Sequence, residues 1–143
     1  MARAGSGARA RQRARELLVK ALYQWQLAGH DVDELTEQFS EAPEYARSDQ
    51  LYFRDLLSLV LEEAPALDRE IARYATRGLD QLDAVGHAIL LLALAELRYR
   101  RDVPPKVVIN EAVELAKRYG ATDSFRFVNA VLDKAASARP EQT

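Results

Sequence analysis

Arginine occupies every second position from Arg9 to Arg15, and this run leads directly toward Lys20 and Tyr23. Guanidinium groups neutralise phosphates, and a tyrosine ring can stack on an unpaired base, so this combination is typical of a contact with nucleic acid. A basic segment near a terminus is equally typical of a solubilising tail. The residues from 9 to 20 are therefore a candidate polyanion site, and the stretch alone leaves both interpretations open.

A second candidate group lies near the carboxyl end of the chain. Helical spacing puts Asp123, Phe127, Ala130 and Lys134 on one side of a helix. A phenylalanine beside a cation is what a stacking platform for unpaired bases requires. The alternative is that Phe127 packs against neighbouring helices, and the spacing alone favours packing.

Residues for other chemistries are scarce. The chain has no cysteine, which excludes disulfides, thiol catalysis and cysteine-ligated zinc. His30 and His87 lack the spacing of metal ligands, and no glycine-rich phosphate loop or serine elbow is present. Carboxylate pairs such as Glu62 and Glu63 are typical of solvated helix faces. We predict no catalytic residues, no metal and no cofactor.

The net charge is unevenly distributed along the chain. Residues 1–20 contain six basic side chains and the single acid Glu16, a balance of +5, so the remainder must carry −7 to give the overall −2. A polyanion should be attracted to one end and weakly repelled by the rest, which favours a localised contact.

The composition is that of one ordinary globular domain: 143 residues, 48% hydrophobic and 29% charged. No apolar run approaches the roughly 20 residues of a membrane span, and no signal peptide is visible, so we expect a cytoplasmic protein with no membrane contact. An arginine-rich start also suits a transit peptide, but Glu16 and the merging with a helix argue against one.

Helix-ending and helix-capping residues predict an all-α fold of about seven helices. The first ends at Gly29, and Asp31 or Asp33 caps the second. The remaining helices are expected from a Ser48 or Asp49 cap to Ala64, from Pro65 to Gly78, from about Leu82 to Tyr99, from Pro104–Pro105 to Gly120, and from a Thr122 or Asp123 cap to Ala138. Pro65 suits the first turn of a new helix.

Apolar spacing predicts which faces are buried. On the first helix the inward residues are Ala14, Leu18, Ala21, Leu22 and Trp25. Arg11 and Arg15 fall in or beside this stripe, where an unpaired charge is costly, so we expect the first turns to project past the core with arginines on all sides. The helix from Leu82 has no polar face and should be surrounded, and Gly86 on it should admit a neighbouring backbone. On the last helix, the expected inward residues are Phe125, Val128, Leu132 and Ala135.

These elements suggest a simple organisation. Residues 1–10 form a basic flexible arm, residues 11–138 form one all-helical domain, and residues 139–143 form a disordered tail. Within the domain, the Ala64–Pro65 junction separates two packed sub-bundles of three-helix type, residues 11–64 and 65–138.

Three blocks of sequence resemble the NusB family of bacterial antitermination factors. They are RARELLVKALYQWQLAG near the start, LYFRDLL from Leu51, and RDVPPKVVINEAVELAKRYGATDSFRFVNAVLDKAA from Arg101 to Ala136. The resemblance extends from Arg11 to Ala136 and agrees with the helix boundaries above.

The resemblance implies a non-enzymatic RNA-binding subunit that binds single-stranded boxA RNA of ribosomal RNA transcripts together with NusE, a small-subunit ribosomal protein. Other Nus factors and RNA polymerase are implied as further partners. The positions that match the family's RNA-contacting residues are Arg11, Arg13, Arg15, Tyr23, Asp123, Ser124, Arg126 and Phe127. Lys20, on the same helical face as Arg13 and Tyr23, is added as an RNA-binding candidate. Gly86 and Pro105 depart from the family pattern near the expected NusE surface, so no NusE-contacting residue is assigned.

Two other functions remain as hypotheses. The first is a helical protein-interaction module whose basic arm only improves solubility. The second, a small helical hydrolase, would need an acid–base pair in a pocket, and the sequence offers no candidate pair.

Overall fold

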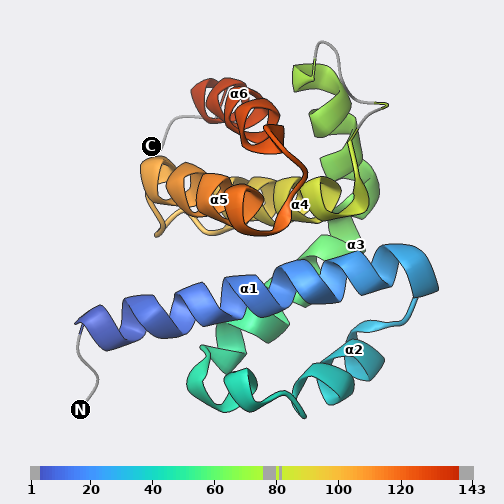
Figure 1. The fold of residues 1–143 in the computed structure, drawn as a ribbon, viewed down its shortest axis with the longest axis vertical. Helices are drawn as coiled ribbons and strands as arrows, with labels where there is room; N and C mark the ends of the chain where they lie inside the picture. Colours follow the sequence, from blue (N-terminus) through green and yellow to red (C-terminus); the bar gives the residue numbers. More distant parts are fainter. Residues whose placement is uncertain (1–3, 76–79, 81, 139–143) are drawn as a thin grey trace. The chain divides into compact units, whose positions relative to one another are not determined.

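The computed structural model describes residues 4–75, 80 and 82–138. It consists of helices joined by short connections (Figure 1). The elements are α1 (Ala4–Ala28), α2 (Val32–Phe39), the 3-10 helix η1 (Pro43–Arg47), α3 (Gln50–Tyr74), α4 (Ala84–Tyr99), α5 (Pro105–Tyr119) and α6 (Ser124–Ser137). The described residues contain no strand, which confirms the all-α prediction. None of the described helices is long and apolar enough to cross a bilayer.

The chain divides into two compact units, Met1–Glu62 and Glu63–Thr143. In the first unit, α1 packs against α2 and η1. Its core is formed by α1 together with Leu35 of α2 and the buried residues of α3, which are Tyr52, Phe53, Leu56, Leu57 and Val60. Phe53 also contacts the rings of Phe39 and Tyr45, so α2 and η1 are held to α3 by aromatic packing.

α3 corrects the prediction of a helix break at Pro65. Instead of two helices there is one, with Pro65 inside it, and the predicted third and fourth helices are merged. Proline removes one backbone hydrogen bond, but its ring is exposed, and the buried stripe of Val60, Ala64, Leu67 and Ile71 continues past it at helical spacing. This continuous apolar stripe stabilises the helix across the proline. The predicted end at Gly78 lies outside the described residues.

In the second unit, α4 packs against both α5 and α6, and α5 packs against α6. Every residue of α4 from Ala88 to Leu97 is buried, which confirms the prediction of a surrounded helix. The last part of α3 is tied to α4 by Arg98, which donates hydrogen bonds to both carboxylate oxygens of Glu70. Those bonds raise the pKa of the Arg98 guanidinium above its ordinary value.

The predicted helix ends are mostly confirmed. Asp31 forms a capping box with Glu34, Asp49 accepts a hydrogen bond from the Tyr52 amide, and Gly29 ends α1 with a positive φ of 72°. At Gly86 the expected close approach of a neighbouring backbone was wrong. An added Cβ would instead meet the side chains of Leu82 and Asp83. Asp83 caps α4 by accepting from the Gly86 amide at 2.7 Å, so this glycine makes room for the cap.

Candidate nucleic-acid interface

One side of α1 is a polar face that carries a tyrosine ring near its C-terminal end. Arg9, Arg13, Lys20 and Tyr23 fall within about 60° of one line along the helix, and each is exposed or half-exposed. Tyr23 is 41% exposed. Neither Arg13 nor Tyr23 forms a side-chain hydrogen bond or ion pair with other described residues. Arg13 and Tyr23 lie about 15 Å apart along the axis, at roughly 1.5 Å per residue, so a strand could contact both.

The opposite side of α1 holds two arginines that the sequence placed at the edge of the core. Arg15 is only 3% exposed, and its guanidinium carbon lies 5.6 Å from the centre of the Tyr52 ring. Arg11 lies 4.2 Å from the same ring and 3.6 Å from the Asp49 carboxylate. The expectation that the first turns carry arginines on all sides is therefore wrong. Cation–π contacts with the buried Tyr52 ring help to stabilise both charges within the unit, together with the Asp49 carboxylate at Arg11.

Asp49 fastens the start of α1 to α3. Its amide donates to the carbonyl of Ala10 at 2.9 Å, while its side chain caps α3 and pairs with Arg11. α1 begins at Ala4, so residues 4–10, which the sequence assigned to a flexible arm, are part of the helix. The basic segment and the core of the first unit are thus built on one continuous helix.

In the second unit the candidate residues gather at the start of α6. Asp123 precedes the helix with φ 66° and ψ 4°, and its side chain makes no capping hydrogen bond. It is the one non-glycine residue with positive φ among those described, a conformation that aspartate tolerates better than most side chains. Asp123 instead lies 3.6 Å from Arg126, with both side chains exposed. Its carboxylate is therefore exposed to solvent at the start of α6.

Ser124, the neighbouring candidate, is oriented inward. Its hydroxyl oxygen is buried and has no hydrogen-bond partner within the described part of the chain. A Cβ on Gly120 would lie 2.4 Å from that oxygen, so the glycine is needed for the close approach of Ser124 to the end of α5. A contact between this hydroxyl and a ligand would require the side chain to turn outward.

One of the two phenylalanines of α6 departs from the predicted arrangement. Phe127 is half-buried, as is Phe125. The core side of α6 is formed by Val128, Val131, Leu132 and Ala135, so Val128, Leu132 and Ala135 face inward as predicted, but Phe125 does not belong to this core. The Phe125 ring instead lines an open groove between α6 and α5.

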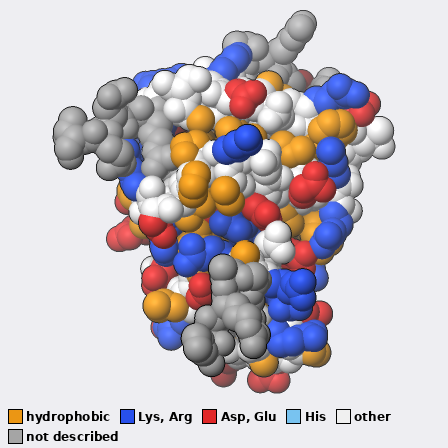
Figure 2. Space-filling view, turned by 90° about the vertical axis from the view of Figure 1, so that its left-hand side faces the viewer, with side chains coloured by type: hydrophobic (Ala, Val, Ile, Leu, Met, Phe, Trp, Pro, Cys, Tyr) orange, Lys and Arg blue, Asp and Glu red, His pale blue; other side chains and the backbone are white. Residues whose placement is uncertain are grey.

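Lys and Arg side chains do not form one continuous basic patch on the face shown in Figure 2. They are interspersed there with acidic and apolar side chains. Among the described residues, no group of three or more histidine, aspartate or glutamate side chains is arranged to hold a metal ion. The arrangement therefore suits local contacts that combine charge with rings.

Comparison with known proteins decides the family. The model of the NusB family matches residues 12–137. The chain belongs to the NusB family. Two relatives named transcription antitermination protein NusB are similar to it throughout. The one from Enterobacter sp. (strain 638) is 51% identical over 134 residues, covering 93% of this chain and 96% of the relative. The one from Photorhabdus laumondii is 50% identical, covering 90% and 94%.

Solved structures of NusB proteins have the same fold. NusB of T. maritima superposes with a TM-score of 0.79 at 32% identity, covering 90% of this chain and 92% of that one. A structure described as antitermination factors NusB and NusE in complex with dsRNA gives a TM-score of 0.74 at 27% identity, covering 91% and 98%.

For this member of the NusB family, the structure adds candidate residues that the sequence patterns did not indicate. Lys117, Phe125 and Asn129 line one groove with Arg126. The helical pattern placed Phe125 in the core because its spacing to Val128 and Leu132 suits an inward stripe. The sequence signal that could have identified it is the basic residue Arg126 directly beside an aromatic one at a helix start.

Proposed function

We propose that this protein is a non-enzymatic transcription antitermination factor that binds boxA-type single-stranded RNA of ribosomal RNA transcripts together with NusE. Other Nus factors and RNA polymerase would be its further partners, in the cytoplasm. The observation that carries the proposal is the exposed face of α1, where cations and the 41%-exposed Tyr23 follow one line, in a chain of the NusB family.

The proposed contacts divide into two kinds. Arg13 and Lys20, with Arg9 beside them, would neutralise phosphates and provide salt-dependent affinity with little sequence preference. Tyr23 and Phe127 would stack on unpaired bases, each contributing about 1–3 kcal/mol. Asp123, whose carboxylate is exposed, would accept hydrogen bonds from a base edge or a 2′-hydroxyl while repelling phosphate.

Three candidate arginines are paired or buried, so their proposed roles differ. Arg126 is exposed and can exchange its pairing with Asp123 for a phosphate. Arg11 is one-third exposed and can contact RNA while remaining against Tyr52. Arg15 is buried, so we propose that it supports the RNA-binding face of α1 from behind.

Single-stranded RNA is proposed because rings need unstacked bases. Bases inside an A-form duplex are stacked, and the deep major groove excludes side chains. The related complex is described with double-stranded RNA, so the two forms should be compared directly.

Fluorescence anisotropy tests the proposal. Labelled boxA-type RNA, a scrambled strand and the boxA duplex are titrated with and without NusE, at about 50 and 200 mM salt. We expect tightest binding to the boxA single strand with NusE, weakening as salt rises. Equal binding of scrambled RNA would refute sequence recognition, and preferential binding of the duplex would refute stacking.

A second function, a protein-interaction module, is favoured by the exposure of Leu27 and Leu51, at 68% and 71%. Deleting residues 1–12 would not separate the two functions, because Ala10 and Arg11 contact α3 and the adjoining Asp49 and their loss would also destabilise the first unit. The double variant Arg9→Gln, Arg13→Gln removes charge and leaves those contacts in place. Unchanged RNA binding in the presence of NusE would favour the interaction module. Arg54→Gln, an exposed position on α3, is the matched control.

A further inference from the structure

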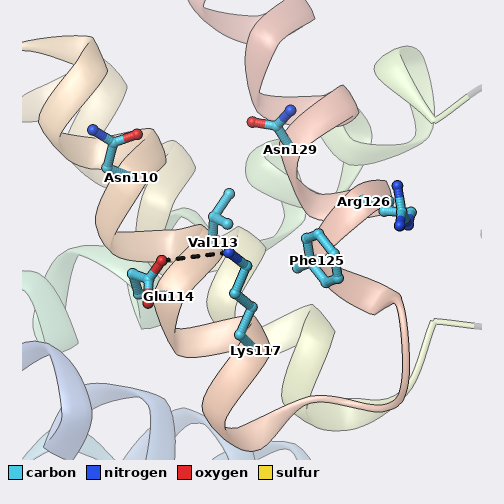
Figure 3. A pocket seen from close by; sticks show the side chains of 7 residues that line it. All are labelled: Asn110, Val113, Glu114, Lys117, Phe125, Arg126 and Asn129. Carbon is cyan, nitrogen blue, oxygen red and sulfur yellow. Dashed lines mark ion pairs between the residues drawn. The ribbon is translucent and has the colours of Figure 1, made fainter.

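A groove between α5 and α6 combines a ring, cations and amides within the second unit (Figure 3). Its volume is about 470 Å³, inside the roughly 300–1,000 Å³ range of small-ligand sites. α5 contributes a stripe at helical spacing that includes Asn110, Glu114 and Lys117, and α6 contributes Phe125, Arg126 and Asn129. Each helix therefore presents one side to the same opening.

The Phe125 ring lies between two cations (Figure 3). Lys117 Nζ is 5.2 Å from the ring centre and Arg126 Cζ is 5.1 Å from it. The ring is half-buried, so part of it is in contact with solvent, and the core of α6 is formed without it. A base stacked on this ring would have its own phosphate close to positive charge, which is the combination used by proteins that bind unpaired nucleotides.

The polar side chains of the groove suit a base edge. The side-chain amides of Asn110 and Asn129 are exposed and form no hydrogen bond with described residues, and each can both donate and accept. Glu114 can accept from an exocyclic amino group. Amides and a carboxylate beside a ring can therefore discriminate between bases as well as hold them.

The charge of the groove also fits one nucleotide. Lys117 and Arg126 oppose the single acid Glu114 among the lining residues, a balance of +1. Lys117 lies 3.6 Å from Glu114, and Arg126 lies 3.6 Å from Asp123, with all four side chains at least half-exposed. Exposed pairs of this kind contribute little stability, so both cations can turn toward a phosphate.

We propose that the groove between α5 and α6 binds one unpaired nucleotide of the RNA, with its base stacked on Phe125 and its phosphate beside Lys117 and Arg126. The inference rests on the RNA-binding function proposed above, and it extends the RNA-contacting surface from the start of α6 to the outer side of α5. Asn110, Glu114 and Asn129 would then select the base.

The test uses the full chain with NusE and boxA-type RNA carrying 2-aminopurine at one position at a time. Phe125→Leu removes the ring and keeps an apolar side chain, whereas Phe125→Tyr keeps the ring. We expect one labelled position to show a fluorescence change on binding that Phe125→Leu abolishes and Phe125→Tyr retains. Affinity should fall by roughly 5-fold or more with Phe125→Leu, the lower end expected for one stacked base.

Two further variants make the result specific. Lys117→Gln should reduce the slope of log affinity against log salt by about 0.7, the value for one phosphate contact on a single strand. Tyr99→Leu removes a 46%-exposed ring elsewhere in the second unit and should change neither affinity nor the labelled position. Thermal melts of every variant establish that the chain is folded.

The outcomes separate this inference from the function on which it depends. If Phe125→Leu binds like the wild type while Phe127→Leu binds more weakly, RNA binding stands and the groove is not part of it. If Phe125→Leu instead loses affinity for NusE measured without RNA, the groove is a protein contact and the inference is overturned. If the wild-type chain with NusE does not prefer boxA RNA over the scrambled strand, the proposed function itself fails.

Discussion

Cations lie against an aromatic ring in both units, but the rings differ in burial. In the first unit, Arg11 and Arg15 lie over Tyr52, which is 1% exposed. In the second, Lys117 and Arg126 flank Phe125, which is only half-buried. The buried ring has no face left for a ligand, whereas a face of the half-buried Phe125 ring becomes available when Lys117 or Arg126 turns away from it. The same interaction should therefore stabilise the fold in one place and prepare a binding surface in the other.

The largest expected difference is in stability. Tyr52→Ala should lower the free energy of unfolding by about 3–5 kcal/mol, as for other large buried aromatic residues, while Phe125→Leu should lower it by less than about 1.5 kcal/mol, as for tolerated apolar replacements. Urea denaturation followed by circular dichroism measures both. Similar losses for the two variants would break the distinction between a structural ring and a binding ring.

Rings assigned to RNA should affect affinity more than stability. Tyr23→Leu and Phe127→Leu should each weaken boxA binding in the presence of NusE by about 1–3 kcal/mol, which is roughly 5- to 150-fold. Because base contacts are lost, the preference over a scrambled strand should also decrease. Anisotropy with both strands provides the measurement. An equal loss on both strands would remove the affected ring from base recognition.

Two arginines of α1 allow a structural cation and a binding cation to be compared within one helix. Arg13→Gln should reduce the salt slope of RNA binding by about 0.7 without altering the melting temperature. Arg11→Gln should cost about 0.5–1 kcal/mol of stability through its lost contact with Tyr52 and change the slope less. Salt titrations and thermal melts distinguish them, with Arg54→Gln as the control for a lost charge. A full loss of slope with Arg11→Gln would show that Arg11 also contacts a phosphate.

The smallest effect is expected at Asp123. Asp123→Asn keeps a residue that tolerates positive φ and removes the negative charge beside Arg126. RNA binding should become about 2- to 5-fold tighter, the scale of an exposed charge contact, with less preference for boxA over the scrambled strand. A large loss of affinity would instead identify the carboxylate as an essential hydrogen-bond acceptor.

Local sequence signals predicted most of the fold because they act within a few residues. Caps at Asp31 and Asp49 and the end of α1 at Gly29 depend on neighbouring backbone groups. Pro65 misled because its local preference for a helix start was outweighed by an apolar stripe that continues on both sides. A proline on the exposed side of a long helix loses one hydrogen bond and little packing.

The candidate site was less predictable because it depends on residues distant in the chain. A helical projection places Arg15 beside the buried stripe of α1. It cannot show that Tyr52 of α3 packs against the guanidinium group. In the same way, the spacing of Phe125 is that of a core residue. Only the packing of α5 against α6 shows that the ring lies beside Lys117 in an open groove. The roles of Arg13, Tyr23, Asp123 and Phe127 remain predictions.

The two faces of α1 couple recognition to folding. Its buried side completes the core of the first unit, and its other side carries Arg9, Arg13, Lys20 and Tyr23. An RNA that binds only the folded helix stabilises it by mass action, by about 2.7 kcal/mol at a hundred times its dissociation constant. Amides of α1 should then exchange hydrogen more slowly when a transcript is bound, so that bound RNA protects the factor from unfolding and proteolysis.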